Sequence, residues 1–257
     1  MKIYVCTKSV ADTAVAIKLV DDTHIQEEDI KFIMNPYDEF ALEEALQLKE
    51  KVGEEAEVIL VSYGNNSIVE VLLHGLAMGA DRSIRINTTN LFNDHITIAA
   101  VLAAAIKKDG EPSIIFTGQH TIDVEGMQTA YRLAAELDLP IVSNVMNFEY
   151  NGDKVMVDRE IEGGDKEIYE VSLPCVIAAK RGLNEPRYPK LPDRMKAKKK
   201  PVTVYEIADL GVEESSAVSL TKFILPPDKP PAKIIGGSPA EAARELVRVL
   251  KEEERVL

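Results

Sequence analysis

The chain has 257 residues, of which 46% are hydrophobic and 28% are charged, and this composition suits a folded domain and excludes general disorder. Its formal net charge of −13 disfavours a nucleic-acid-binding protein, which would carry a basic binding face. Its two cysteines, Cys6 and Cys175, lie far apart and outside any Cys/His cluster, which excludes a disulfide framework and a zinc or iron–sulfur site of its own and fits a reducing compartment.

Strands and helices are predicted to alternate through the first 145 residues. In chain order we expect strand 2–7, helix 36–51, strand 57–63, helix 67–78, strand 82–86, helix 94–108, strand 113–117, helix 126–137 and a strand from 140. Asn35 is expected to cap the first of these helices, and Ser67 the second, with capping-box spacing to Glu70. This alternation is typical of a parallel sheet with helices on both faces.

The pattern changes after residue 145. Turn signals at 151–153 and 163–164 indicate antiparallel strands, and 174–179 is expected to rejoin the sheet. An extended tail follows from 211, and Ser238 is expected to cap a final amphipathic helix that folds back or docks on another chain. We therefore predict a doubly wound, mostly parallel α/β domain over 1–210, with an antiparallel addition and a protruding loop, and a C-terminal helical tail over 211–257.

The protruding loop is predicted over residues 180–201, where four prolines exclude a strand and break any long helix. Residues 180–200 carry nine Lys/Arg and two acidic residues, with apolar residues between them. Such a loop suits a partner with an acidic rim and a hydrophobic pocket. A solvated run of charge is the plainer alternative.

Neither a signal peptide nor a transmembrane segment is expected. The N-terminus enters a strand directly, and the longest apolar run, 96–106, is too short to cross a bilayer. We expect a soluble, cytoplasmic protein.

The usual catalytic motifs are missing from the sequence, which contains no GxGxxG, P-loop, GxSxG or HExxH pattern, and its four histidines show no metal-binding spacing. Three polar segments do follow predicted strands or open a helix, namely Cys6-Thr7, 35–38 and 117–129. Open α/β sheets bind ligands at such places, and the amide and hydroxyl side chains of 117–129 could contact a base, ribose or phosphate. An ordinary turn before a capped helix is the alternative.

Four blocks of the sequence resemble the β subunits of electron-transfer flavoproteins, and the likeness extends over nearly the whole chain. The blocks are MNPYDEFALEEALQLKEK (34–51), LAMGADR (76–82), VDREIEGGDKEIYEVSLPCVIAA (157–179) and LNEPRYPKLPDRMKAKKK (183–200). The resemblance implies a heterodimer with an α subunit that carries the redox-active FAD, on which the C-terminal tail would pack. It also implies docking on acyl-CoA dehydrogenase or a similar flavin dehydrogenase, and delivery of electrons to acceptors such as a quinone oxidoreductase.

The resemblance implies an adenine nucleotide in the β subunit itself, which is AMP in housekeeping members and a second FAD in electron-bifurcating members. The second FAD takes a hydride from NADH, so the ligand also decides whether the complex is an enzyme or an electron carrier. Residues 122–129 depart from both subtypes at Val124, Glu125 and Met127, whereas Asp38 favours the FAD-binding kind. The sequence therefore leaves the choice between AMP and FAD open.

The resemblance also assigns site residues by position. Nucleotide contacts are implied for Cys6, Asn35, Pro36, Tyr37, Asp38, Ser62, Tyr63, Gly118, Gln119, His120, Thr121, Ile122, Asp123, Val124, Glu125, Gly126, Met127, Gln128 and Thr129. Docking contacts are implied for Leu183, Arg187, Tyr188, Leu191, Met195, Lys196 and Lys199, with Leu191 as the anchor and the two lysines as methylation sites in some members. No residue is assigned as a catalytic acid or base, and none as a metal ligand.

Two other classes use related sheets. One is an adenylate-using enzyme, for which the expected SGGxD, HIGH or KMSKS motif is missing here. The other is a stand-alone nucleotide sensor of the universal-stress type, whose second glycine-rich phosphate loop is also missing.

Overall fold

The computed structural model describes residues 1–89, 94–215, 217–227 and 231–257. The chain forms two compact units, Met1–Lys222 and Phe223–Leu257, which are treated separately below. The packing of the tail on a partner subunit stays a prediction.

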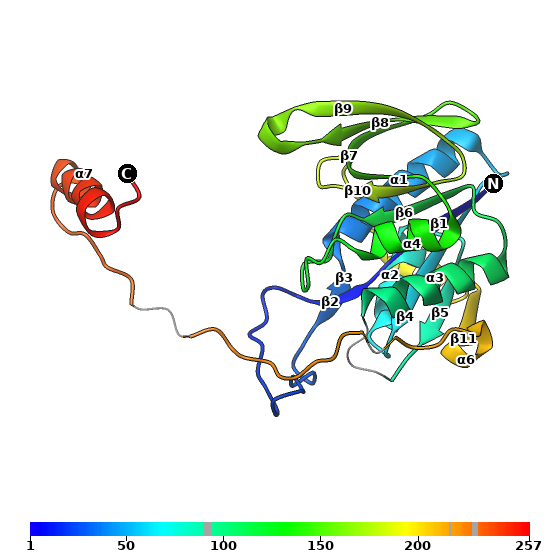
Figure 1. Cartoon of the computed structure of the whole chain (residues 1–257), viewed down its shortest axis with the longest axis horizontal. Coiled ribbons are helices and arrows are strands. Elements are labelled where there is room, and N and C mark those ends of the chain that lie inside the picture. Colours follow the sequence, from blue (N-terminus) through cyan, green and yellow to red (C-terminus); the bar gives the residue numbers. More distant parts are fainter. Residues whose placement is uncertain (90–93, 216, 228–230) are drawn as a thin grey trace. The chain divides into compact units, whose positions relative to one another are not determined.

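The first unit is built around a nine-stranded sheet in the order β11-β5-β4-β1-β6-β10-β7-β8-β9 (Figure 1). Pairing is parallel from β11 to β7, and β8 and β9 continue it antiparallel. The strands are β1 (Lys2–Cys6), β4 (Glu57–Gly64), β5 (Arg82–Asn87), β6 (Ile114–Gly118), β7 (Ile141–Tyr150), β8 (Lys154–Glu160), β9 (Lys166–Ser172), β10 (Cys175–Ala179) and β11 (Val202–Glu206). This confirms the predicted mostly parallel sheet with an antiparallel addition.

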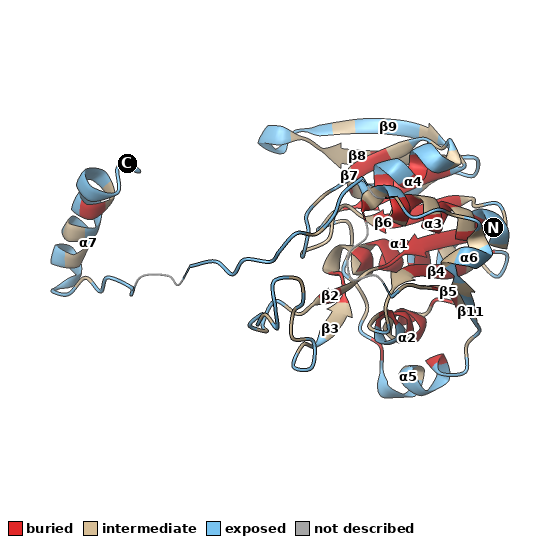
Figure 2. Cartoon of the chain, turned by 60° about the horizontal axis from the view of Figure 1, so that its bottom comes forward, coloured by how far each residue is buried: buried red, intermediate tan, exposed pale blue. Residues whose placement is uncertain are grey.

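Helices cover both faces of the sheet. On one face, α1 (Pro36–Val52) and α2 (Ile68–Met78) pack on Ile3 and Val5 of β1. On the other, α3 (His95–Asp109) and α4 (Thr129–Leu137) pack on Tyr4 and Cys6. Because successive side chains of a strand point to opposite faces, each central strand contributes side chains to the core on both faces of the sheet. The central strands are accordingly buried (Figure 2).

Several small elements were not expected from the sequence. They are the two-stranded sheet of β2 (Ser9–Ala11) and β3 (Phe32–Met34), the edge strand β11 and the short helices α5 (Leu191–Ala197) and α6 (Ile207–Leu210). Each is short, so local periodicity carried little signal for it. The 3₁₀ turn Glu162–Gly164 agrees with the turn expected at 163–164.

One predicted helix start was wrong, whereas Asn35 and Ser67 occupy the predicted N-cap positions but make no side-chain capping hydrogen bond. Helix α4 begins at Thr129 and not at Gly126, because Glu125 and Met127 have φ of 52° and 53°, which an α-helix does not accept. Ser67 makes no capping hydrogen bond, since its own backbone is already helical. Asn35 makes none either, because its side chain is engaged elsewhere in the tertiary structure.

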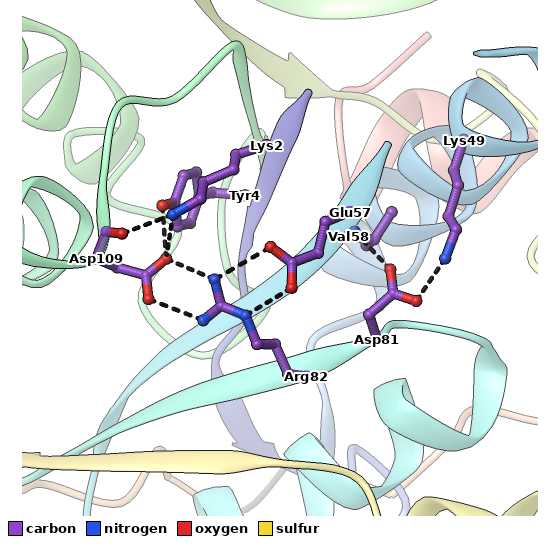
Figure 3. A network of polar contacts seen from close by, with 8 residues as sticks. All are labelled: Lys2, Tyr4, Lys49, Glu57, Val58, Asp81, Arg82 and Asp109. Atoms are coloured by element: carbon purple, nitrogen blue, oxygen red, sulfur yellow. Dashed lines mark hydrogen bonds and ion pairs between the residues drawn. The ribbon is translucent and has the colours of Figure 1, made fainter. Parts of the chain in front are cut away.

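An ion-pair network joins the amino ends of β1, β4 and β5 (Figure 3). Arg82 donates to both carboxylate oxygens of Asp109, at 2.8 and 2.7 Å, and to Glu57. Tyr4 and Lys2 also donate to Asp109. Ion pairs and hydrogen bonds thus stabilise the edge of the sheet that lies opposite the carboxyl ends of the strands.

The second unit contains the C-terminal helix α7 (Pro239–Arg248), which continues as a π-helical segment, Val249–Glu253. The predicted cap is confirmed, since Ser238 and Glu241 form a capping box. Its apolar residues Leu246 and Val247 are exposed.

Candidate functional site

A cavity lies at the carboxyl ends of the neighbouring strands β1 and β6. The strands of this sheet that follow β1 in the sequence, β4 and β5, lie on one side of it, and the chain then crosses to β6 on the other side. Ligands of open α/β sheets bind at such switch points. The cavity is lined by Cys6, Thr7, Lys8, Asp38, Tyr63, His95, Ile98, Leu102, Thr117, Gly118, Gln119, His120, Thr121, Gly126, Met127, Gln128, Thr129 and Ala130.

Asp38 is the buried acid that joins three segments at this cavity. Its carboxylate accepts hydrogen bonds from the backbone N–H of Lys8 at 2.8 Å, from Asn35 Nδ2 at 2.9 Å and from the backbone N–H of Gly118 at 3.1 Å. Burial raises the pKa of Asp38 to about 7, against the lowering effect of these hydrogen bonds. A Cβ at Gly118 would lie 2.3 Å from Asp38 Oδ1, so residue 118 is glycine because the carboxylate lies against it.

Asn35 fixes the loop that follows β6. Its amide nitrogen donates to the carbonyl of His120 at 2.9 Å, and its amide oxygen accepts from the backbone N–H of Ile122 at 3.2 Å. Asn35 therefore positions the loop from the interior of the protein.

The loop of residues 119–128 is also tied to the segment after β1. Lys8 Nζ lies 2.6 Å from Asp123 Oδ2, and Thr121 Oγ1 donates to the other oxygen of Asp123. Two of its residues, Glu125 and Met127, have positive φ although they are not glycine. Backbone strain of this kind persists where surrounding contacts determine the conformation, and it is frequent at ligand-binding sites.

Several residues that line the cavity have buried polar atoms without a hydrogen-bond partner among the described residues. They are Thr7 Oγ1, Thr117 Oγ1, Gln119 Oε1 and His120 Nδ1. Buried polar groups are normally satisfied, so these atoms fit a polar ligand. The ring of His120 lies 4.1 Å from that of Tyr37, which holds the imidazole in place.

Cys6 lies at the end of β1 in the cavity wall and is buried. Burial, together with the charge of Asp38, raises the pKa of its thiol to about 12. Cys6 is thus an uncharged wall residue and not a nucleophile.

Many of the sequence-predicted residues converge on the cavity, and others do not reach it. Those in its wall are Cys6, Asp38, Tyr63, Gly118, Gln119, His120, Thr121, Gly126, Met127, Gln128 and Thr129. Those outside it are Asn35, Pro36, Tyr37, Ser62, Ile122, Asp123, Val124 and Glu125. Ser62 is fully buried and donates to the backbone carbonyl of Thr7 at 2.7 Å.

Sequence reasoning missed Lys8, His95, Ile98, Leu102 and Ala130 in the cavity wall. One signal could have found His95: helix α3 follows a parallel strand, so its first residues return to the carboxyl edge of the sheet.

The predicted docking residues divide into two groups. Leu183 packs against the core, and Arg187 donates to the buried Glu43 at 2.8 and 2.9 Å and to Glu50. Tyr188, Leu191 and Met195 are 80%, 76% and 61% exposed, and Lys196 and Lys199 are exposed as well.

Both ends of this segment are fixed to the body of the protein. Asn184 Nδ2 donates to the carbonyl of Phe40 at 3.0 Å, and Lys200 Nζ donates to the carbonyls of Leu76 and Ala80 at the end of α2. A hollow of about 370 Å³ lies between the end of α2 and the segment. The exposed side chains are thus carried on a segment with fixed ends.

Within the described ranges, the structure contains no group of three His, Cys, Asp or Glu side chains that could hold a metal ion. In the same part of the chain, none of the helices combines the length and apolar character of a membrane span.

Comparison with known proteins agrees with this arrangement. Residues 22–210 match the family model described as electron transfer flavoprotein domain. The chain is 40% identical over 262 residues to electron transfer flavoprotein subunit beta of Bacillus subtilis, with 100% of both chains covered. It is 39% identical over 260 residues to the mitochondrial subunit beta of Arabidopsis thaliana, again with 100% of both chains covered. It is 37% identical over 260 residues to that of Mus musculus, covering 100% of this chain and 99% of the relative. Because the likeness extends over the full length, the chain belongs to the family of electron transfer flavoprotein β subunits.

Proposed function

We propose that this chain is the nucleotide-binding subunit of a heterodimeric electron carrier, with an adenine nucleotide, FAD or AMP, in the cavity at β1 and β6. The observation that carries the proposal is that residues lining that cavity have buried, unpartnered polar atoms, which include Thr7 Oγ1, Thr117 Oγ1 and Gln119 Oε1. The relatives are named subunit beta, which supports an α subunit as partner. That subunit would carry the redox-active FAD.

Different walls of the cavity suit different parts of a nucleotide. Ile98 and Leu102 of α3 offer an apolar surface for the adenine ring, and Gln119 and His120 offer polar groups for the base or ribose. Lys8 and the amino end of α4 at Thr129 favour a phosphate. A bound flavin supplies the hydride and electron transfer, and the residues of this chain bind it, orient it and exclude water.

We also propose that the exposed side chains of residues 188–199 dock on a flavin dehydrogenase such as an acyl-CoA dehydrogenase. Leu191 is the apolar anchor, and Lys196 and Lys199 attract an acidic rim.

The test is to purify the heterodimer, record its visible spectrum, denature it by heat and count the released FAD and AMP. One FAD and one AMP per heterodimer indicate a simple carrier, whereas two FAD and no AMP, with NADH oxidation, indicate a bifurcating complex. Absence of both nucleotides from this chain contradicts the proposal. A colourless monomer that hydrolyses ATP favours the stand-alone sensor or adenylate-using enzyme instead.

A further inference from the structure

His95 is a cavity residue without an assigned role. It is the first residue of α3, and its Nδ1 lies 3.0 Å from the hydroxyl of Thr129 at the start of α4. When that hydroxyl donates to Nδ1, the neutral imidazole carries its proton on Nε2. Among the described residues, the ring makes its hydrogen bond through Nδ1, and Nε2 is left to donate to something else.

Gly126 lies directly against this ring. A Cβ at residue 126 would be 2.6 Å from His95 Nε2 and 3.0 Å from Cε1. The backbone of Gly126 does not have positive φ, so its conformation would accept a side chain, whereas its neighbours Glu125 and Met127 have positive φ without being glycine. A side chain at residue 126 would therefore displace the imidazole from its present position.

Charged side chains of both signs surround His95, and Arg132, which donates to the neutral Gln128, is the cation among them without a carboxylate partner in the described part of the chain. The cations near the ring are Lys8 and Arg132, and the anions are Asp94 and Asp123. Both anions are engaged, since Asp94 caps the backbone N–H groups of Ile96 and Thr97 and Asp123 pairs with Lys8.

A second observation points to the same place. The amino end of α4 has no side-chain cap, and the buried hydroxyls of Thr7 and Thr117, which have no partner in the described part of the chain, line the same cavity. Helix N-termini and hydroxyl groups are common ligands of phosphate.

We propose that His95 donates from Nε2 to the phosphate attached to the adenosine of the bound nucleotide, and that Gly126 leaves room for its ring. The inference deepens the proposed function and rests on it. The 5′-phosphate of adenosine is common to AMP and FAD, so the contact serves either ligand.

This contact makes nucleotide binding depend on pH. Burial, and then the charges of Lys8 and Arg132, lower the pKa of His95 below its usual 6.5, so the free ring is neutral at pH 7. A phosphate beside the ring raises that pKa, and binding then takes up a proton. Protonation of His95 therefore contributes an affinity for the phosphate that increases as the pH falls, in addition to the pH dependence of the phosphate itself.

The test uses the full-length chain, purified with its α partner and freed of nucleotide, and measures the Kd of AMP and of adenosine between about pH 5.5 and 8. His95→Asn keeps an amide near the position of Nδ1 and removes the Nε2 donor. We expect it to weaken AMP binding about tenfold and to leave adenosine binding unchanged. His95→Gln keeps a donor near the position of Nε2 that does not titrate, so it should retain AMP affinity. Its remaining pH dependence should be that of the phosphate alone, whose second pKa is about 6.

A double-mutant cycle tests the pairing with Gly126. Gly126→Ala should weaken AMP binding as much as His95→Ala does, and the double variant should bind no more weakly than His95→Ala alone. Equal losses of AMP and adenosine affinity in His95→Asn, unchanged AMP affinity in that variant, or additive losses in the cycle would overturn the assignment of His95. If the unaltered chain binds neither AMP nor adenosine, the nucleotide site itself is wrong and the assignment falls with it.

Discussion

At the scale of single residues, the site depends on a carboxyl group that is kept out of water. The pKa of Asp38 is raised to about 7 by burial, above its ordinary 3.8, so the folded state holds the proton more tightly than the unfolded state. The contribution of Asp38 to the free energy of unfolding therefore decreases as the pH rises from about 4 to about 7. Asp38→Asn removes this ionisation. The free energy of unfolding of the unaltered protein should exceed that of the variant by more at about pH 5 than at about pH 8. Urea unfolding at the two pH values measures this difference. The exposed Asp22→Asn is the matched control, and a difference for Asp38→Asn that stays constant with pH would contradict the argument.

At the scale of elements, the segment that precedes and contains α5 combines fixed ends with exposed apolar side chains. Leu191 is 76% exposed, so Leu191→Ala should leave the fold and the bound nucleotide unchanged. If Leu191 is the docking anchor, the variant should slow electron exchange with the dehydrogenase about tenfold, in a stopped-flow measurement of flavin reduction. Val20→Ala, another exposed apolar residue, is the control. Loss of the nucleotide from Leu191→Ala would mean that this segment serves the nucleotide site instead.

The fixed end of the same segment makes a separate prediction. Arg187 donates from its backbone N–H and its guanidinium to Glu43, whose side chain is 5% exposed. Burial alone would raise the pKa of Glu43, but the hydrogen bonds from Arg187 outweigh it and lower the pKa. Glu43→Gln should loosen the segment and raise the KM for the dehydrogenase several-fold, with kcat nearly unchanged. An unchanged KM would show that docking does not depend on the contact between Arg187 and Glu43.

At the scale of the whole molecule, the network around Arg82 stabilises the amino edge of the sheet, and the cavity lies at the opposite, carboxyl edge. The side chains of Arg82 and Asp109 are 17% and 13% exposed, so an uncompensated charge there is costly. Asp109→Asn should lower the free energy of unfolding by about 3 kcal/mol near neutral pH. Burial would raise the pKa of Asp109, but Arg82 and Tyr4 lower it below 3.8, so this contribution should fade as the pH falls below that value. Urea unfolding measures it, and the exposed Lys154–Glu170 pair is the control, since Lys154→Ala should have a much smaller effect on the free energy of unfolding. An equal effect of the two substitutions would contradict the role of the network.

The sequence by itself determined the alternation of strands and helices, the antiparallel addition, the exposed apolar residues of the basic segment and the family. These properties depend on local periodicity, turn residues and near neighbours, which a single chain displays directly. The Ser238 cap, for example, needs only Glu241, three residues further on.

Only the tertiary structure decided which residues share the cavity. Lys8 meets Asp123, Asp38 meets Gly118, and His95 lies against Gly126, in each case across many residues of sequence. Asn35 is the N-cap residue of α1, but a long-range contact engages its side chain with the loop after β6, and α4 begins only at Thr129. Contacts of this kind arise when parallel strands bring their carboxyl ends to one edge, and no local pattern encodes which side chains then face each other.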